Sequence, residues 1–152
     1  MKIDSAERTI LAELQEDARI TNAELARRVG LSESHCFRRV KALEKAGVIQ
    51  RYAARVDRRK LGLAVTAFVE VTMERQPDAA TEDFLARVRA EPHIIECHAM
   101  SGSHDYLMKV VARSIDHFSE LCMQRILKFP GVSHVQSSFS LDEIKLDAVV
   151  PT

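Results

Sequence analysis

The sequence of 152 residues contains no tryptophan, only five glycines and four prolines, and no run of about 20 apolar residues. Without such a run, or a basic start followed by an apolar stretch, neither a transmembrane span nor a secretory signal is expected. The few glycines form no phosphate-binding fingerprint, which argues against a dinucleotide site. The proportions of hydrophobic (46%) and charged (29%) residues exclude a disordered or collagen-like chain. We therefore expect a folded cytoplasmic protein that does not enter a membrane.

Cysteine is also scarce: the chain has three, with no Cys-x-x-Cys pair, which argues against a disulfide framework or a zinc knuckle. Cys97 has His93, His98 and His104 near it in the sequence, but these residues show no regular ligand spacing. Cys97 and His98 are also adjacent in an expected strand, so they should point to opposite faces. We expect no metal and no cofactor. Nor do we expect an enzyme, because no catalytic Ser/His/Asp set or paired carboxylates stand in a recognisable context.

The net charge is zero because 22 Lys/Arg residues balance 22 Asp/Glu residues, but the two signs are distributed unevenly along the chain. Residues 1–60 hold 14 basic and 9 acidic side chains, whereas residues 61–152 hold 8 and 13. The basic excess is strongest over residues 27–60, with 11 basic and 3 acidic side chains. Such an asymmetry indicates a nucleic-acid-binding portion joined to a portion with another role.

The basic half contains the start and stop signals of three short helices. A first helix begins at Asp4, and a second begins at the capping box formed by Thr21 and Glu24. Gly30 ends the second helix, and Ser32 caps a third immediately afterwards. A helix, a short turn with glycine and another helix is the spacing of a helix-turn-helix.

The third helix separates an apolar face from a basic one. Cys36, Val40 and Leu43 recur at helical spacing and should face inward. The helix and its surroundings then supply two expected groups of DNA-binding residues. Those contacting bases or adjacent phosphates are Ser34, His35, Arg38 and Arg39, and those holding phosphates are Arg28, Lys41, Lys45, Arg51 and Arg55. The last two belong to residues 48–56, which read as a short strand or wing. For any single arginine, a solvated surface charge is the alternative.

The acidic half alternates strands and helices. Strands are expected at 64–73, 94–101, 105–112 and 132–141, with helices that end before Pro92 and at Pro130. This β-α-β-β-α-β order predicts a ferredoxin-like domain, so the fold class is α+β. The expected domains are a winged helix-turn-helix at 1–56, a hinge at 57–63 and the ferredoxin-like domain at 64–152. Two helices cover only one face of such a sheet, which favours dimerisation through the other.

Several segments together resemble the Lrp/AsnC (feast/famine) family of bacterial transcription regulators. They are ERTILAELQEDARITNAELARRVGLS, RVKALEKAGVIQRYAA, ECHAMSGSHDYLMKV and FPGV. The resemblance runs from about Ile3 to Ile144, in both halves and in the same order. It implies a homodimer that often assembles into tetramers or octamers, and a small effector, usually an amino acid, bound in the C-terminal domain.

The resemblance also implies an effector loop between two central strands. The loop residues carried over are Met100, Ser101, Gly102, Ser103, His104, Asp105 and Tyr106, completed by Gln136, Ser137 and Ser138 of a neighbouring subunit. Gly102 would allow a tight turn whose amides meet an α-carboxylate, and Asp105 would receive an α-ammonium group. Ser103 and His104 depart from the acidic and aromatic residues usual there, so the preferred amino acid is open. The alternative is a plain hairpin turn capped by Asp105.

The function expected is a sequence-specific transcription regulator that binds double-stranded DNA and whose DNA affinity or assembly changes with an amino-acid effector. One alternative is an architectural, nucleoid-type protein with little sequence choice. A second is a regulatory module that acts on an enzyme partner and uses its basic half for protein contacts.

Overall fold

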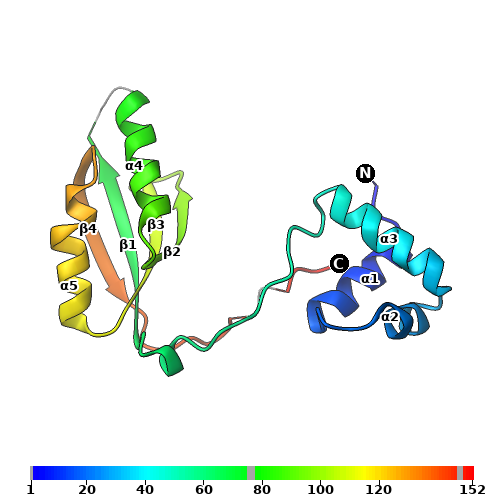
Figure 1. The fold of residues 1–152 in the computed structure, drawn as a ribbon. Helices are drawn as coiled ribbons and strands as arrows, with labels where there is room; N and C mark the ends of the chain where they lie inside the picture. Colours follow the sequence, from blue (N-terminus) through cyan, green and yellow to red (C-terminus); the bar gives the residue numbers. More distant parts are fainter. Residues whose placement is uncertain (1, 75–77, 147–148) are drawn as a thin grey trace. The chain divides into compact units, whose positions relative to one another are not determined.

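The computed structural model describes residues 2–74, 78–146 and 149–152, with the backbone alone for 78–80. The chain forms two compact units, residues 1–55 with 145–152 and residues 56–144. The first unit contains α1 (Ser5–Glu16), α2 (Asn22–Val29) and α3 (Glu33–Lys45) (Figure 1). The second contains η1 (Arg59–Leu61), β1 (Val65–Met73), α4 (Asp78–Ala90), β2 (Ile94–Ala99), β3 (Tyr106–Ala112), α5 (Ile115–Gln124), η2 (Ile126–Lys128) and β4 (Val132–Phe139).

Local signals set the starts of the three N-terminal helices, as predicted. Asp4 accepts a hydrogen bond from the Glu7 amide, and the Glu7 carboxylate returns one, which completes a capping box. Thr21 caps α2 through the Glu24 amide, but the Glu24 carboxylate binds arginines instead of closing the box. Ser32 caps α3. Between α2 and α3, Gly30 adopts the left-handed conformation, with φ of 67°.

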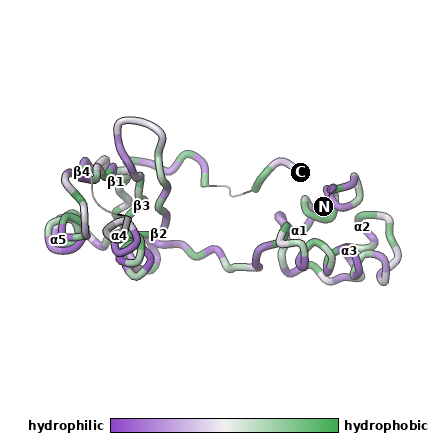
Figure 2. The backbone as a smooth tube through the Cα atoms, turned by 90° about the horizontal axis from the view of Figure 1, so that it is seen from above, coloured by the Kyte–Doolittle hydropathy of each residue, from purple (hydrophilic) through white to green (hydrophobic). Residues whose placement is uncertain are grey.

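The three helices enclose a small core. Its fully buried members are Ile10 of α1, Leu25 and Ala26 of α2, and Cys36 and Leu43 of α3. Figure 2 shows hydrophobic and hydrophilic residues alternating along these helices, as expected for helices with one buried face. Burial also raises the pKa of the Cys36 thiol, so this cysteine behaves as a core residue.

The strand expected at 48–56 is not formed. All of these residues lie outside helices and strands, and they continue α3 as an irregular segment. A strand needs a hydrogen-bonded neighbour, and the described part of this unit contains no other strand. Residues 48–56 therefore form an irregular segment in this unit, and the expected strand was wrong.

The second unit is a four-stranded antiparallel sheet in the order β2-β3-β1-β4, with α4 and α5 on one side (Figures 1 and 2). This confirms the predicted α+β order. Ala67, Val69 and Val71 of β1 are buried against the helices, so the alternate residues Phe68 and Glu70 lie on the open face.

The helix expected to run up to Pro130 ends earlier. After Gln124 the backbone of Arg125 leaves helical geometry, at φ −124° and ψ −68°, and a 3-10 turn follows. This tighter turn buries Ile126, while Phe129 packs edge-on against Phe84 of α4. The helix therefore ends before Pro130 because the residues after Gln124 pack into the core in a different conformation.

The chain's last residues group with the first unit, whereas the sequence assigned them to the second domain. Val150 donates its N–H to the Gln15 side chain (2.8 Å) and accepts a hydrogen bond from it (3.1 Å). Arg55 also donates to the backbone carbonyl of Leu146. Sequence patterns do not reveal these contacts, because the partners are far apart along the chain.

Candidate functional site

Helix α3 presents the group of exposed polar residues that the sequence predicted for DNA contact. Ser34, His35 and Arg38 are exposed, and their side chains make no hydrogen bond or ion pair with the described residues. Lys45 and Arg51 are likewise exposed and unpaired within the described chain. These five side chains are available to bases and phosphates.

The other predicted DNA-binding cations have partners within their own unit. Arg28 pairs with Glu24 and Glu13, both at 2.9 Å, and Lys41 pairs with Glu44 at 2.7 Å. Hydrogen bonds from Arg27 and then Arg28 lower the pKa of Glu24 to about 2, so this carboxylate stays charged. Phosphate contact by Arg28 or Lys41 would therefore replace or share an existing ion pair.

Arg39 contacts two carboxylates of its own unit and is less exposed than Arg28 or Lys41. Its guanidinium lies 2.6 Å from the carboxylate of Asp4 and 3.6 Å from that of Glu7, and only a third of its side chain is exposed. The side chain thus links α3 to the start of α1. Arg39 therefore has a structural role that the sequence pattern did not reveal.

Phe37 is a candidate contact residue that the sequence reasoning missed. Its side chain is 52% exposed on α3, and Lys41 Nζ lies 5.7 Å from the centre of its ring. An exposed aromatic ring among unpaired polar residues can contact the methyl group of thymine. Its position one residue after buried Cys36 was the available signal.

In the second unit, the loop between β2 and β3 is held by Asp105. The Asp105 carboxylate accepts a hydrogen bond from the Met73 amide (2.7 Å) at the end of β1. Its backbone N–H donates to Val71 (2.9 Å), and its carbonyl accepts from Met100 (2.9 Å). Asp105 thus closes the loop through Met100 and fastens it to β1, as the plain-turn alternative requires.

Beside this loop lies a cavity of about 140 Å³. Its lining residues are Glu70, Met100, Ser101, Gly102, Ser103, His104, Tyr106 and Leu107. Six of them are predicted effector-loop residues, whereas Asp105 is not among them. Glu70, which the sequence reasoning missed, comes from the open face of β1, and its carboxylate lies 2.8 Å from His104 Nε2.

Gly102 does not have the conformational role that the sequence suggested. Its backbone is not in the left-handed region, and a Cβ placed there would meet nothing within 4 Å. The N–H groups of Ser101, Gly102 and Ser103 donate to none of the described residues. Glycine here leaves these amides uncovered, and no tight turn requires it.

The predicted effector residues of the strands do not share one face of the sheet. The Tyr106 ring packs against Phe84 of α4 (4.7 Å between centroids), on the helix-covered side. Gln136 pairs with Glu70 in the β1–β4 register, which puts Gln136 and Ser138 on the open face. Ser137 pairs with Val69 in the same register and so lies on the helix-covered face.

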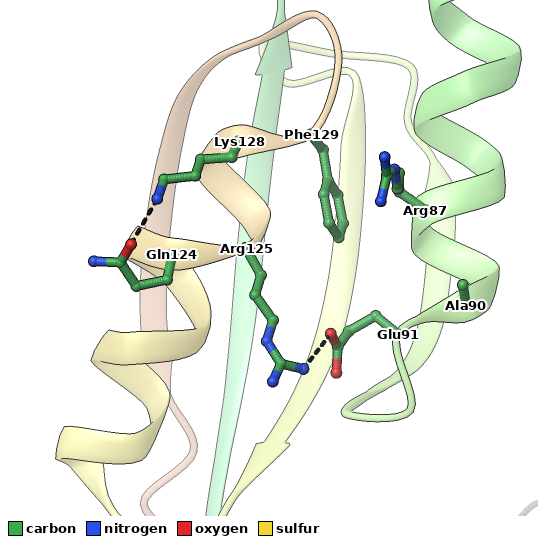
Figure 3. A pocket seen from close by; sticks show the side chains of 7 residues that line it. All are labelled: Arg87, Ala90, Glu91, Gln124, Arg125, Lys128 and Phe129. Carbon is green, nitrogen blue, oxygen red and sulfur yellow. Dashed lines mark hydrogen bonds and ion pairs between the residues drawn. The ribbon is translucent and has the colours of Figure 1, made fainter.

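A larger cavity of about 440 Å³ lies between the ends of α4 and α5 (Figure 3). Arg125 pairs there with buried Glu91 at 2.9 Å, and Lys128 bonds to Gln124 at 2.6 Å. Burial alone would raise the pKa of Glu91, but hydrogen bonds from Arg125 and His93 hold it below its ordinary value. These contacts neutralise a buried carboxylate and secure the helix ends.

The described part of the chain shows neither a metal site nor a membrane-spanning helix. No group of three His, Cys, Asp or Glu side chains there is arranged to hold a metal ion. In the same residues, no helix is both long and apolar enough to cross a membrane.

Two families match this chain. Residues 3–50 match a winged helix-turn-helix DNA-binding family, and residues 66–150 match the Lrp/AsnC ligand-binding domain. The chain is 38% identical over 143 residues to the leucine-responsive regulatory protein of Escherichia coli K12, covering 94% of this chain and 87% of that protein. It is 34% identical over 149 residues to the transcriptional regulator AzlB of Bacillus subtilis, covering 98% and 95%.

Solved structures agree with these matches. A transcriptional regulator from Neisseria meningitidis, crystallised with L-methionine, superposes with a TM-score of 0.94 at 40% identity, covering 99% of this chain and 97% of that one. A feast or famine regulatory protein from Mycobacterium tuberculosis, also complexed with L-methionine, gives 0.89 at 32% identity, covering 99% and 100%. These matched families pair DNA binding with ligand binding and are regulators, not enzymes. The chain belongs to the Lrp/AsnC family of DNA-binding transcription regulators.

Proposed function

We propose that this regulator reads specific DNA sites through Ser34, His35, Arg38 and Phe37 of α3, while Lys45 and Arg51 hold phosphates. The observation that carries the proposal is the set of exposed side chains on α3 that lack a partner in the described chain. Arg28, Arg39, Lys41 and Arg55 are secondary contributors, because each already has a partner. Two such units in a dimer would read half-sites one helical turn apart, about 34–36 Å, or a multiple of it.

We further propose that a free amino acid binds at the cavity beside residues 100–107 and alters DNA affinity or assembly. Support comes from a carboxylate and from amides that donate to none of the described residues, all at one cavity, and from the L-methionine bound to two related regulators. The protein acts in the cytoplasm as a homodimer or a larger homo-oligomer. The open face of the sheet, where Phe68 is 38% exposed, is the proposed dimer surface, and Gln136 and Ser138 of a neighbouring subunit would complete the site.

Fluorescence anisotropy on the duplex upstream of the protein's own gene tests both proposals. The titration is run at fixed salt with random-sequence competitor, alone and with each of the twenty amino acids. Preference over competitor that changes with one or a few amino acids is expected. Preference that no amino acid alters would remove the effector proposal. A ratio of specific to nonspecific affinity near one would favour the architectural alternative.

A further inference from the structure

We infer that Glu70, and not Asp105, binds the amino group of the effector. The inference rests on the proposed amino-acid site and identifies the chemical feature of the ligand that this chain recognises. It predicts selection for a protonated amine beside a carboxylate, and against 2-hydroxy acids of the same shape.

Asp105 is poorly placed for this task because its hydrogen bonds hold the loop. Its carboxylate accepts from the Met73 amide at 2.7 Å, and its backbone bonds to Val71 and Met100. The side chain is also not among the residues that line the cavity. Turning its carboxylate toward a ligand would leave the Met73 amide without its partner.

Glu70 supplies the carboxylate that lines the cavity, and 36% of its side chain is exposed. Its described partner is His104 Nε2, at 2.8 Å. A carboxylate has about four lone-pair sites, so this contact leaves acceptor positions for an ammonium group. His104 is therefore a positioning residue that holds the Glu70 carboxylate at the cavity.

The rest of the lining suits the opposite end of a zwitterion. The amides of Ser101, Gly102 and Ser103 donate to none of the described residues, and no side chain at Gly102 covers them. Consecutive free amides attract a carboxylate, while a carboxylate attracts an ammonium group. Both ends of an α-amino acid thus have a partner, with Met100 and Leu107 as apolar lining.

Calorimetric titration of the 152-residue chain tests this assignment. The probes are the twenty L-amino acids, followed by the tightest binder and its 2-hydroxy acid; for L-methionine this is 2-hydroxy-4-(methylthio)butanoate. The wild type is expected to prefer the amino acid at least tenfold. Glu70→Gln should lose this preference. It should bind the amino acid at least tenfold more weakly than wild type does, and the hydroxy acid as tightly as wild type does.

Two variants make the result specific. Glu120→Gln removes an exposed carboxylate of α5, away from the open sheet face and outside the lining of this cavity, and should behave as wild type. Asp105→Asn should lower the Tm but keep the preference for the amine. Loss of that preference in Asp105→Asn, or its survival in Glu70→Gln, would overturn the inference. A wild type that binds none of the twenty amino acids would refute the proposed site itself, and this assignment with it.

Discussion

Arg39 of α3 and Asp4 at the start of α1 are 35 positions apart in the sequence, yet their side chains form a hydrogen-bonded ion pair of 2.6 Å. The same guanidinium lies 3.6 Å from Glu7, which is buried. The Glu7 amide and then Arg39 hold the pKa of the Asp4 carboxyl below its ordinary value. The pair therefore joins α3, the helix proposed to contact DNA, to the start of α1.

Arg39→Ala should lower the Tm by a few degrees, because it leaves the Glu7 carboxylate buried without its cation. Lys45→Ala, on the same helix but without a described partner, should leave the Tm unchanged. A lowered pKa means that Asp4 adds stability above about pH 4 and loses it as the pH falls. The difference between wild type and Arg39→Ala, followed by circular dichroism, should therefore shrink at pH 3. An unchanged Tm at pH 7 would contradict the structural role.

Arg38→Ala and Lys45→Ala should affect DNA binding differently. Loss of a base contact at Arg38 should relax sequence preference by about 1–3 kcal/mol, whereas loss of a phosphate contact at Lys45 should weaken all duplexes alike. Anisotropy at several salt concentrations should also show a smaller salt slope for Lys45→Ala. Uniform loss in both variants would show that α3 does not enter the groove as proposed.

Phe37→Ala should weaken binding to the specific site and leave the salt slope unchanged, because no charge is removed. The Tm should also stay the same, since the ring is 52% exposed. The same anisotropy series measures this effect, with thymine-to-uracil substitutions in the site to remove the methyl groups. A variant with wild-type affinity would exclude Phe37 as a base contact.

His117 should make the second unit less stable in mild acid. Burial, followed by the charges of Arg113 and His93, lowers its pKa, and its Nδ1 accepts a hydrogen bond from the Arg113 N–H at 3.2 Å. A lowered histidine pKa means that stability is complete above about pH 6.5 and falls as the pH drops through the folded-state pKa. Between pH 7.5 and pH 5, the Tm should therefore fall less steeply for His117→Asn than for wild type. His98→Asn, at a 62% exposed side chain, is the matched control, and equal slopes in all three proteins would refute the assignment.

Two glycines should respond differently to alanine. Gly30→Ala should lower the free energy of unfolding by about 1–2 kcal/mol, because its left-handed backbone disfavours a Cβ even where there is room. Gly102→Ala should have no such effect, since its φ is not left-handed and its surroundings are open. Chemical denaturation of both variants measures the contrast. Equal losses would mean that Gly102 also has a conformational role.

Features that depend on neighbouring residues could be predicted from the sequence. The caps at Asp4, Thr21 and Ser32 act over three positions, and the alternation along β1 fixes which residues face the helices. The order of strands and helices could be predicted from these signals, because apolar residues repeat at a different spacing in a strand and in a helix.

Features that depend on distant partners could not be predicted. The composition of residues 48–56 cannot reveal that a strand partner is missing, and the charge of Arg39 does not disclose its pairing with Asp4. At the effector loop, the motif drew attention to Asp105, whereas the β1–β3 register brings Glu70 to the cavity. The pairing of the strands therefore had to be known before Glu70 could be distinguished from Asp105 as the carboxylate that lines the cavity.

The pair of hydrogen bonds between Gln15 and Val150 has a consequence for dissecting this protein. Since the described residues 145–146 and 149–152 group with residues 1–55, the backbone passes between the two units twice. A protease that cuts near residue 57 would therefore leave the DNA-binding fragment attached by the noncovalent contacts of the tail. A second cut near residue 144 would be needed to separate the two units cleanly, and the released helical fragment would still carry a peptide from the far end of the chain.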